Sequence, residues 1–514
     1  MARLSNSLAR QLGLTKNSGR QVVRSIDELI GVPNGHALRR AWDRIGLSAI
    51  LFVDGRPTTF FKELQQLRSS DIRRYHRFVW NQGIATLLVI TTPTEVFVFS
   101  GQAPPANEEA DVASENRLVE KLDRVNDALE VERLVYRIET GKIYEQHPES
   151  FDQEQAVDQY LLRNLGEVAH QLHQANRKLS LARIHSLLGR AIFVCYLVDR
   201  EIIGAEFFAD AGAKKSASLA EMFNRMSSED AINSLYELFA ALQAKFNGSL
   251  FDDDLLDEKV KFSSKHIEIL TRFLNGDELR SGQKSLGFWA YDFNFIPIET
   301  ISAIYEEFLG VEEQAGQTAS KTFQRKSGAY YTPKHLAELV IDTATDGTNG
   351  ILGKKSLDPA CGSGIFLVSL FNRMAEEWRA KNLNRKSDTR WRELVSILQN
   401  DLFGIDKNET ACRITCFSLY LALLDQFAPF DITELSKDGK LLPALMLKAG
   451  EQPTESSPRT ILCRNFFEAD LPPEFTDFDL IIGNPPWIGR NQPGDPIADA
   501  WHSASFAPLL SSIS

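Results

Sequence analysis

The chain has 514 residues, which is too long for one hydrophobic core, so we expect several domains. Its 43% hydrophobic and 25% charged residues are usual for a globular protein, and its apolar runs are far shorter than a membrane-spanning helix, so we expect no membrane partner. The net charge of −12 excludes a uniformly basic surface.

The five cysteines form an odd and scattered set, which indicates a reducing compartment and no disulfide framework. Cys412 and Cys416 are four residues apart, but no second pair or nearby histidine completes a zinc site, so no metal is expected. No secretory signal is evident, although the Arg-rich first 26 residues also fit an organellar transit peptide.

Residues 1–46 predict one or two helices, because apolar residues recur at helical spacing on both sides of a turn at residues 16–20. This segment holds eight basic residues against three acidic ones, whereas residues 451–514 hold three against nine. A solvated helix face is the simpler interpretation of the basic residues, and contact with phosphate groups is the alternative.

The next block is rich in strand signals. A turn at Asp54-Gly-Arg-Pro57 separates two apolar runs and predicts a hairpin. The predicted order is a hairpin, a helix and two strands, over residues 49–61, 68–82, 85–91 and 95–99. Residues 102–118 are rich in proline and acidic residues and predict a linker, after which the pattern becomes helical up to about residue 310.

Residues Leu357–Phe366, Leu-Asp-Pro-Ala-Cys-Gly-Ser-Gly-Ile-Phe, join a predicted strand to a predicted helix through a turn with few side chains. Gly362 and Gly364 permit backbone angles that other residues avoid, and the following helix offers its N-terminal amides, which suits a nucleotide-like ligand. The sequence matches neither the dinucleotide nor the triphosphate glycine motif. A purely structural turn is the alternative.

A second stretch, Asp479–Trp487, runs from an apolar strand into a rigid tip, Asn-Pro-Pro-Trp, which alone is also compatible with a surface turn. Together with the glycine turn it resembles the paired motifs of adenine-N6 DNA methyltransferases that use S-adenosylmethionine, in the order in which the cofactor motif comes first. The resemblance is to enzymes of type I and type IIG restriction-modification systems and related phage-defence systems, and it is specific from Lys321 to Arg490.

The resemblance implies an α/β fold: a Rossmann-like methyltransferase domain with an incomplete sheet, preceded by a helical domain and an N-terminal α+β nuclease-like domain. It implies a cytoplasmic enzyme of a bacterium or archaeon, with double-stranded DNA as partner. The expected boundaries are 1–101 for the nuclease-like domain, 102–118 for the linker, 119–310 for the helical domain and 311–514 for the methyltransferase domain.

Two features of the helical domain resemble the same enzymes. One is the long helix Leu181–Arg200, whose Arg190, Asp199 and Arg200 are explained more simply by ion pairs than by DNA contacts. The other is residues 291–309, which resemble that domain's final strand and helix, with Pro297 and Glu299 at the helix start.

The resemblance also implies the residues that bind S-adenosylmethionine. The methionine end lies along a segment in which Thr332 and Pro333 are expected as N-cap and first helical residue. Asp406, at the end of a second predicted strand, is expected to accept bonds from the ribose hydroxyls, with a surface loop acid as the alternative. The full expected set is Tyr331, Thr332, Pro333, Asp358, Pro359, Ala360, Gly362, Gly364, Asp406, Asn465 and Phe466, the last two meeting the adenine of the cofactor.

The catalytic tip is expected at Asn484, Pro485, Pro486 and Trp487. The lone pair of adenine N6 is delocalised, and an Asn oxygen and a neighbouring carbonyl that accept bonds from the amino group draw it toward tetrahedral geometry. Trp487 is expected to stack on a base flipped out of the duplex. Asp479, at the start of the strand, is expected to be structural.

Some type IIG enzymes carry an Asp…Glu-x-Lys nuclease at the N-terminus, and the strand and helix order over residues 49–99 resembles its core. The positions of its catalytic residues correspond here to Ser48 and to Lys62-Glu63-Leu64, which lack the paired carboxylates that hold Mg²⁺. An inactive relic is therefore predicted, with Asp54 and Glu63 as its candidate ligands.

Only 27 residues follow Trp487, too few for the remaining strands and for a target-recognition domain. We therefore expect a truncated or split methyltransferase that a C-terminal polypeptide completes. The alternatives are a noncatalytic remnant that binds the cofactor or DNA, and a methyltransferase of RNA or of protein glutamine.

Overall fold

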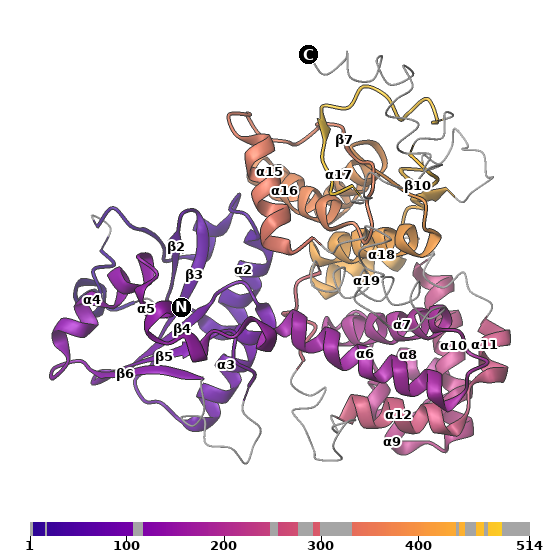
Figure 1. Cartoon of the computed structure of the whole chain (residues 1–514), viewed down its shortest axis with the longest axis horizontal. Helices are drawn as coiled ribbons and strands as arrows, with labels where there is room; N and C mark the ends of the chain where they lie inside the picture. Colours follow the sequence, from indigo (N-terminus) through magenta and orange to yellow (C-terminus); the bar gives the residue numbers. More distant parts are fainter. Residues whose placement is uncertain are drawn as a thin grey trace, which may run out of the picture.

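The computed structural model describes residues 4–15, 18–105, 117–246, 255–275, 291–298, 332–437, 442–447, 459–466 and 471–485. These residues form three parts: an N-terminal sheet with flanking helices, a helical bundle, and a C-terminal α/β part that lies above the bundle in Figure 1. Within these ranges, no helix combines the length and the apolar character needed to cross a membrane.

The N-terminal sheet has the strand order β1-β2-β3-β4-β5-β6. Strands β3 and β4 pair in parallel across the connecting helix α3, and the other neighbours are antiparallel. The strands are β1 (Gln21–Val23), β2 (Ala49–Val53), β3 (Arg56–Glu63), β4 (Leu87–Thr91), β5 (Glu95–Ser100) and β6 (Leu118–Asp123). The α-helices are α1 (Asn6–Gln11), α2 (Gly35–Ala41), α3 (Ser69–Gln82), α4 (Ala128–Glu139) and α5 (Lys142–Gln146), with a π-helix at Trp42–Gly46.

The predicted hairpin, helix and two strands are confirmed. Asp54 and Gly55 join β2 to β3 with φ angles of 50° and 74°. Two consecutive residues with positive φ are typical of the hairpin turn whose twist matches that of the strands, which explains the Asp-Gly pair.

Two expectations for this part differ from the structure. The helices predicted over residues 1–46 are interrupted by strand β1, where Val22 and Val23 contribute to the apolar clusters on opposite sides of the sheet. Strand β6 follows the expected linker yet pairs with β5, so the sheet extends beyond residue 101. Strand β1 has only three residues, too few for alternation to stand out from a helical pattern.

The helical bundle follows, and it includes the long helix predicted at Leu181–Arg200 as α7. The helices are α6 (Val157–Ala175), α7 (Leu181–Asp199), α8 (Ala205–Asp210), α9 (Leu219–Arg225), α10 (Ser228–Phe246), α11 (Leu255–Lys261) and α12 (Ser264–Asn275). Arg190 on α7 is fully buried and pairs with Glu258 at 2.5 Å, as expected for an ion pair between helices.

The strand expected at the start of residues 291–309 is not observed. Residues 291–298 form turns whose backbone amides donate to side chains instead of to a neighbouring strand. The amide of Asp292 donates to Asn81 at 2.8 Å, and that of Phe293 donates to Asp199 at 2.9 Å. Glu299 lies outside the described residues.

The C-terminal part contains a parallel sheet in the order β11-β7-β8-β10-β9. Its strands are β7 (Ser356–Asp358), β8 (Leu402–Asp406), β9 (Met446–Leu447), β10 (Ile461–Cys463) and β11 (Leu480–Ile481). Its helices are α15 (Lys334–Thr345), α16 (Ile365–Lys381), α17 (Ser387–Asn400), α18 (Glu409–Asp425) and α19 (Pro429–Lys437). This alternation confirms an α/β fold for the part predicted to be Rossmann-like.

The two faces of this sheet are covered differently. Side chains on one face, such as Leu402 and Ile461, belong to a large apolar cluster shared with α16, α17 and α18. Phe403 on the other face packs edge-to-face against Phe475 and Phe478, with ring centroids 4.9 and 5.4 Å away. The short aromatic segment before β11 thus covers the face opposite the helices.

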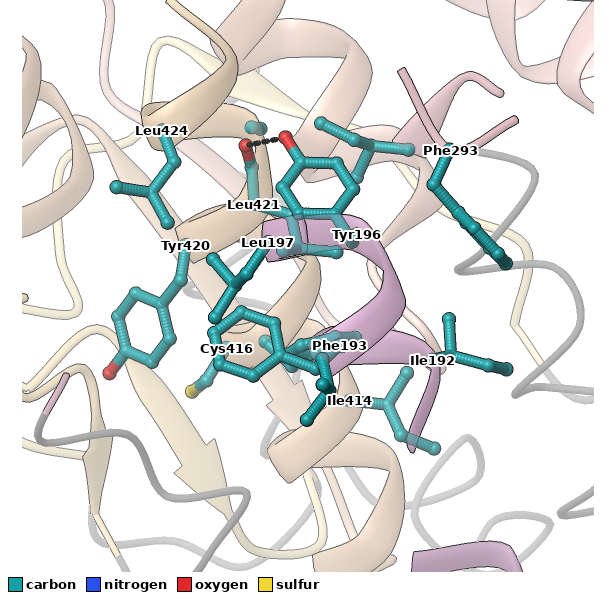
Figure 2. Packing of buried hydrophobic residues seen from close by; sticks show 14 of the residues in the cluster. Ile192, Phe193, Tyr196, Leu197, Phe293, Ile414, Cys416, Tyr420, Leu421 and Leu424 are labelled. Carbon is teal, nitrogen blue, oxygen red and sulfur yellow. Dashed lines mark hydrogen bonds between the residues drawn. The ribbon is translucent and has the colours of Figure 1, made fainter. Parts of the chain in front are cut away.

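Helix α7 of the bundle packs directly against α18 of the α/β part (Figure 2). Phe193 and Phe417 meet edge-to-face with their centroids 5.3 Å apart. The hydroxyl of Tyr196 donates to the carbonyl of Leu421 at 3.3 Å, which satisfies a buried polar atom. The bundle and the α/β part therefore share one apolar core rather than meeting at a polar domain interface.

All three parts meet at the buried carboxylate of Asp425 at the end of α18, and Glu376 on α16 adds a second buried carboxylate that pairs with the N-terminal part. Asp425 pairs with Arg40 of the N-terminal part and with Arg200 of the bundle. Glu376 accepts two bonds from Arg39, at 3.1 and 2.6 Å. These ion pairs tie the distal ends of α16 and α18 to the N-terminal part.

We expect Asp425→Asn to lower the free energy of unfolding by about 3 kcal/mol, because it removes the carboxylate that pairs directly with the guanidinium groups of Arg40 and Arg200. Burial already lowers the pKa of Arg40 to about 10 and that of Arg200 to about 9. Urea denaturation followed by circular dichroism measures the change. The control is Glu201→Gln, whose exposed pair with Arg44 is worth less than about 1 kcal/mol. Equal losses in the two variants would contradict this account.

Candidate active site at the carboxyl ends of the parallel strands

Because the strands of the C-terminal sheet are parallel, the loops that follow β7, β8, β10 and β11 emerge at one edge of the sheet. These loops carry most of the residues singled out from the sequence. They are Asp358, Pro359, Ala360, Gly362 and Gly364 after β7, Asp406 at the end of β8, Asn465 and Phe466 after β10, and Asn484 and Pro485 after β11.

The glycine turn after β7 requires its glycines. Gly362 and Gly364 have φ angles of 53° and 85°, and Gly364 is the N-cap of α16. A Cβ atom on Gly364 would lie 2.9 Å from the Thr415 side chain. The Thr415 hydroxyl in turn donates to the carbonyl of Gly362 at 2.8 Å. Thr415 was not identified from the sequence, since nothing in its spacing on α18 distinguishes it from a core residue.

Two carboxylates hold the turn in place. Asp358 is 1% exposed and accepts a bond from the amide of Ala360 at 3.1 Å. Asp406 is half-buried and accepts bonds from the amides of Gly362 at 3.1 Å and Asn408 at 2.8 Å. Asp406 thus links the glycine turn to the start of α18.

The segment before α15 joins this edge through a direct contact. The side-chain amide of Asn484 donates to the hydroxyl of Thr332 at 3.1 Å. Thr332 is not the N-cap of α15 as expected: Pro333 takes that place and the helix begins at Lys334. Tyr331 lies outside the described residues, as do Pro486 and Trp487.

The loops after β7 and β11 approach each other closely at Gly483. A Cβ atom at this position would lie 2.5 Å from Asp358 Oδ1 and 3.3 Å from Pro359. The sequence signal for this contact is the glycine directly before Asn484.

At the other end of these strands, Asp479 has the structural position expected for it. Its carboxylate accepts a bond from the amide of Lys355 at 2.8 Å, which fastens the start of β11 to the start of β7. Burial, together with the charge of Asp479, raises the pKa of the nearby Asp401 to about 6.

Phe466 and Asn465 lie in the loop after β10, and both are half-buried. Phe466 packs against the apolar cluster on the face of the sheet that includes Phe403. The two residues thus stand on the far side of Asp406 from Asn484, because the strand order places β8 and β7 between β10 and β11.

The candidate nuclease residues are not brought together. Asp54 lies at the hairpin turn and Glu63 at the opposite end of β3. Glu63 accepts a bond from the amide of Ser5 at 2.6 Å, and Lys62 donates to the carbonyl of Gly46 at 2.8 Å. Asp54 and Glu63 therefore do not form a shared metal site. Among the described residues, no group of three or more His, Cys, Asp or Glu side chains is arranged to hold a metal ion.

The sequence was compared with known families and proteins. Residues 298–428 match the N-6 DNA Methylase family, and residues 400–505 match the Eco57I restriction-modification methylase family. The predicted resemblance to methyltransferases of restriction-modification systems is confirmed.

Two curated relatives show how far the similarity extends. The chain is 25% identical over 282 residues to the type II restriction enzyme and methyltransferase RM.Eco57I of Escherichia coli, which covers 50% of this chain and 27% of that protein. It is 28% identical over 127 residues to the type I restriction enzyme MjaIX methylase subunit of Methanocaldococcus jannaschii, covering 24% of this chain and 17% of the relative. The matched regions thus span about a quarter or less of each relative's length.

Solved structures were also compared. One is the type IIL restriction-modification enzyme MmeI, solved in complex with DNA. The match covers 60% of this chain and 40% of the MmeI chain, with 17% identity and a TM-score of 0.38. The match to the type IIG restriction endonuclease BpuSI covers 93% of this chain and 46% of the BpuSI chain, with 12% identity and a TM-score of 0.31.

We expect Gly483→Ala to lower the thermal unfolding midpoint, because the new methyl group would displace the buried carboxylate of Asp358 from its bond with Ala360. The matched control is Gly166→Ala in α6, where a Cβ meets nothing within 4 Å and where alanine stabilises a helix by about 0.5–1 kcal/mol. A midpoint for Gly483→Ala at or above that of the native chain would show that the two loops do not touch.

Proposed function

We propose that this chain is the S-adenosylmethionine-binding and catalytic part of an adenine-N6 DNA methyltransferase of a restriction-modification or phage-defence system. The observation that carries the proposal is the contact between two distant motifs. The tip at Asn484 and the glycine turn follow neighbouring parallel strands, and the Asn484 side chain touches Thr332 from the segment expected to line the cofactor.

The residues at this edge suit S-adenosylmethionine. The turn at Gly362 and Gly364 lets a ligand approach the backbone where side chains would block it, and α16 starts at the same point with its N-terminal amides. The carboxylate of Asp406 is proposed to accept bonds from the ribose hydroxyls. Asn465 and Phe466 are suited to the adenine ring, and Thr332 and Pro333 to the methionine end, with Tyr331 assigned to that end by resemblance.

The cofactor, when bound, supplies a methyl group on a positively charged sulfur. The task of the protein is then to hold the target amino group in line with that methyl group. The Asn484 amide nitrogen donates to Thr332, and we propose its oxygen as the acceptor for a proton of adenine N6. The carbonyl of Pro485 is the second proposed acceptor.

The substrate base has to leave the duplex to reach this edge, because its amino group lies inside the stacked helix. Pro486 and Trp487, at the end of the motif, are proposed to stiffen the loop and to stack on the extruded base. The N-terminal part itself carries no paired carboxylates at the positions expected of a nuclease.

A second candidate function is a noncatalytic cofactor- or DNA-binding subunit that needs a C-terminal partner. Among the described residues, the edge of the sheet at β11 is suited to a further strand. Strand β11 is the last strand on its side among the described residues, and Ile481 is 46% exposed. On α15, Leu339 is 53% exposed. Apolar residues at a strand edge are suited to pairing with a further strand.

We expect the chain to bind S-adenosylmethionine in titration calorimetry, and Asp406→Ala to weaken binding at least about tenfold, because a bond to a charged group is lost. Asn484→Ala should leave cofactor affinity close to native while methyl transfer falls by about a hundredfold or more. Asn400→Ala, on an exposed helix end, is the control for both measurements. Loss of cofactor binding in Asn484→Ala and not in Asp406→Ala would contradict these roles.

Methyl transfer from labelled S-adenosylmethionine separates the two candidate functions. We expect incorporation into duplex DNA in the presence of the proposed C-terminal polypeptide, if that polypeptide supplies further strands of the sheet. Binding of the cofactor without transfer under either condition would favour the noncatalytic subunit. Single-stranded RNA and a glutamine-bearing protein serve as control substrates, and transfer to either in place of DNA would contradict the assignment.

A further inference from the structure

The first glycine of the turn after β7 is held at both of its backbone polar groups. The amide of Gly362 donates to the carboxylate of Asp406 at 3.1 Å, and its carbonyl accepts a bond from the hydroxyl of Thr415 at 2.8 Å. The same hydroxyl lies 3.7 Å from the sulfur of Cys361. Thr415 is on α18 and is 0% exposed. A buried side chain of the neighbouring helix thus supplies one of the two bonds that fix Gly362.

The bond from Thr415 sets the direction of a whole peptide unit. The carbonyl of Gly362 and the amide of Ser363 belong to one planar trans unit, so the two groups point in opposite directions. Because the carbonyl points toward α18, the amide of Ser363 points away from that helix. A ligand that approaches the backbone of the turn therefore meets polar groups whose directions depend on Thr415.

This restraint acts where the chain alone would not fix the conformation. Gly362 has a φ of 53°, and glycine populates positive and negative φ about equally. The residue type therefore permits the turn but does not select it. Without the Thr415 hydroxyl, the carbonyl of Gly362 loses its donor, and the peptide unit gains freedom to rotate.

The methyl group of Thr415 packs beside the second glycine of the turn. A Cβ atom on Gly364 would lie 2.9 Å from the Thr415 methyl carbon and 3.1 Å from its hydroxyl oxygen. Gly364 has a φ of 85°, and its amide donates to the carbonyl of Cys361 at 2.7 Å. The hydroxyl of Thr415 thus holds one glycine while its methyl group borders the other. Serine and valine each supply only one of these contacts.

We propose that Thr415 is a positioning residue for S-adenosylmethionine, which selects the one conformation of the glycine turn that accepts the cofactor. Thr415 acts through the backbone of the turn, since its side chain is buried and its hydroxyl is engaged by Gly362. A turn that is already ordered loses less freedom on binding, which favours affinity. The effect on the cofactor rests on the proposed function, whereas the restraint on the turn does not.

Hydrogen–deuterium exchange of the intact chain tests the restraint in the absence of any ligand. Thr415→Val removes the hydroxyl and keeps the shape of the side chain. We expect amides of residues 361–364 to exchange at least about tenfold faster in this variant, because one hydrogen bond no longer opposes local opening.

The matched control is Thr460→Val at the opposite edge of the same sheet. Thr460 is also 0% exposed, and its hydroxyl donates to the carbonyl of Leu398 at 3.0 Å, just before β10 begins. This variant loses the same kind of bond from the same part of the molecule. We expect exchange to rise near the start of β10 and to remain native in the glycine turn.

Calorimetry with S-adenosylmethionine tests the consequence for binding. We expect Thr415→Val to bind about tenfold more weakly and Thr415→Ser, which keeps the hydroxyl, to bind within about twofold of the native chain. Thr460→Val should bind with native affinity despite a comparable fall in the unfolding midpoint. If Thr415→Val does not fold, Thr415→Ala removes the hydroxyl without placing a second methyl group beside Gly364.

Three results would overturn the role of Thr415. They are native affinity in the variant that lacks the hydroxyl, an equal loss of affinity in Thr460→Val, and unchanged exchange in the turn. If the native chain does not bind S-adenosylmethionine while loss of the hydroxyl still speeds exchange in the turn, the proposed function fails and only the restraint on the turn stands.

Discussion

The parallel pairing of β11 with β7 is the constraint on which the candidate site depends. The register of Leu480 with Ser356 and of Ile481 with Leu357 brings together segments more than a hundred residues apart in the chain. From that register the loops that follow must emerge at the same edge. The bond between Asn484 and Thr332 and the close approach of Gly483 to Asp358 are consequences of it. A shift of one residue would turn the side chains of this short strand to the wrong face.

Helices α16 and α18 connect this edge of the sheet to the N-terminal part and the bundle. Helix α16 begins beside the glycine turn and α18 begins beside Asp406. Toward their far ends, Glu376 and Asp425 form ion pairs with arginines of the N-terminal part and, for Asp425, also of the bundle. The loops of the site are therefore fixed on both sides: the strands that precede them are paired in the sheet, and the helices that follow them are anchored by buried ion pairs. Residues in such doubly fixed loops lose little freedom when a ligand binds, which favours affinity.

Much of the α/β part was predictable because its elements are locally distinct. The strand Leu402–Asp406 and the helix after Gly364 were placed correctly, since an apolar run that ends in an acid or a glycine turn is typical of such a fold. The Asp-Gly hairpin was predictable for the same reason. Contacts such as Thr415 with the carbonyl of Gly362 were not, because they join positions whose spacing carries no pattern.

The wrong predictions share a cause. Two segments form strands because they pair with a neighbouring strand, residues 21–23 with β2 and residues 118–123 with β5. The turns at residues 291–298 form where the side chains of Asn81 and Asp199 accept hydrogen bonds from backbone amides. In each case a tertiary partner decides the local structure, and the segment itself is too short to reveal it. The pairing of β6 with β5 beyond the expected boundary at residue 101 is one such case.

The packing of α7 on α18 bears on how chains of this kind can diverge. Phe193 and Phe417 interlock edge-to-face across the boundary between bundle and α/β part, so replacing either helix alone with that of a distant homologue leaves a void or an overlap. Genetic exchange that separates the two helices would be selected against. A productive crossover has to carry both together, and the bundle and the front half of the α/β part are therefore expected to be inherited as one block.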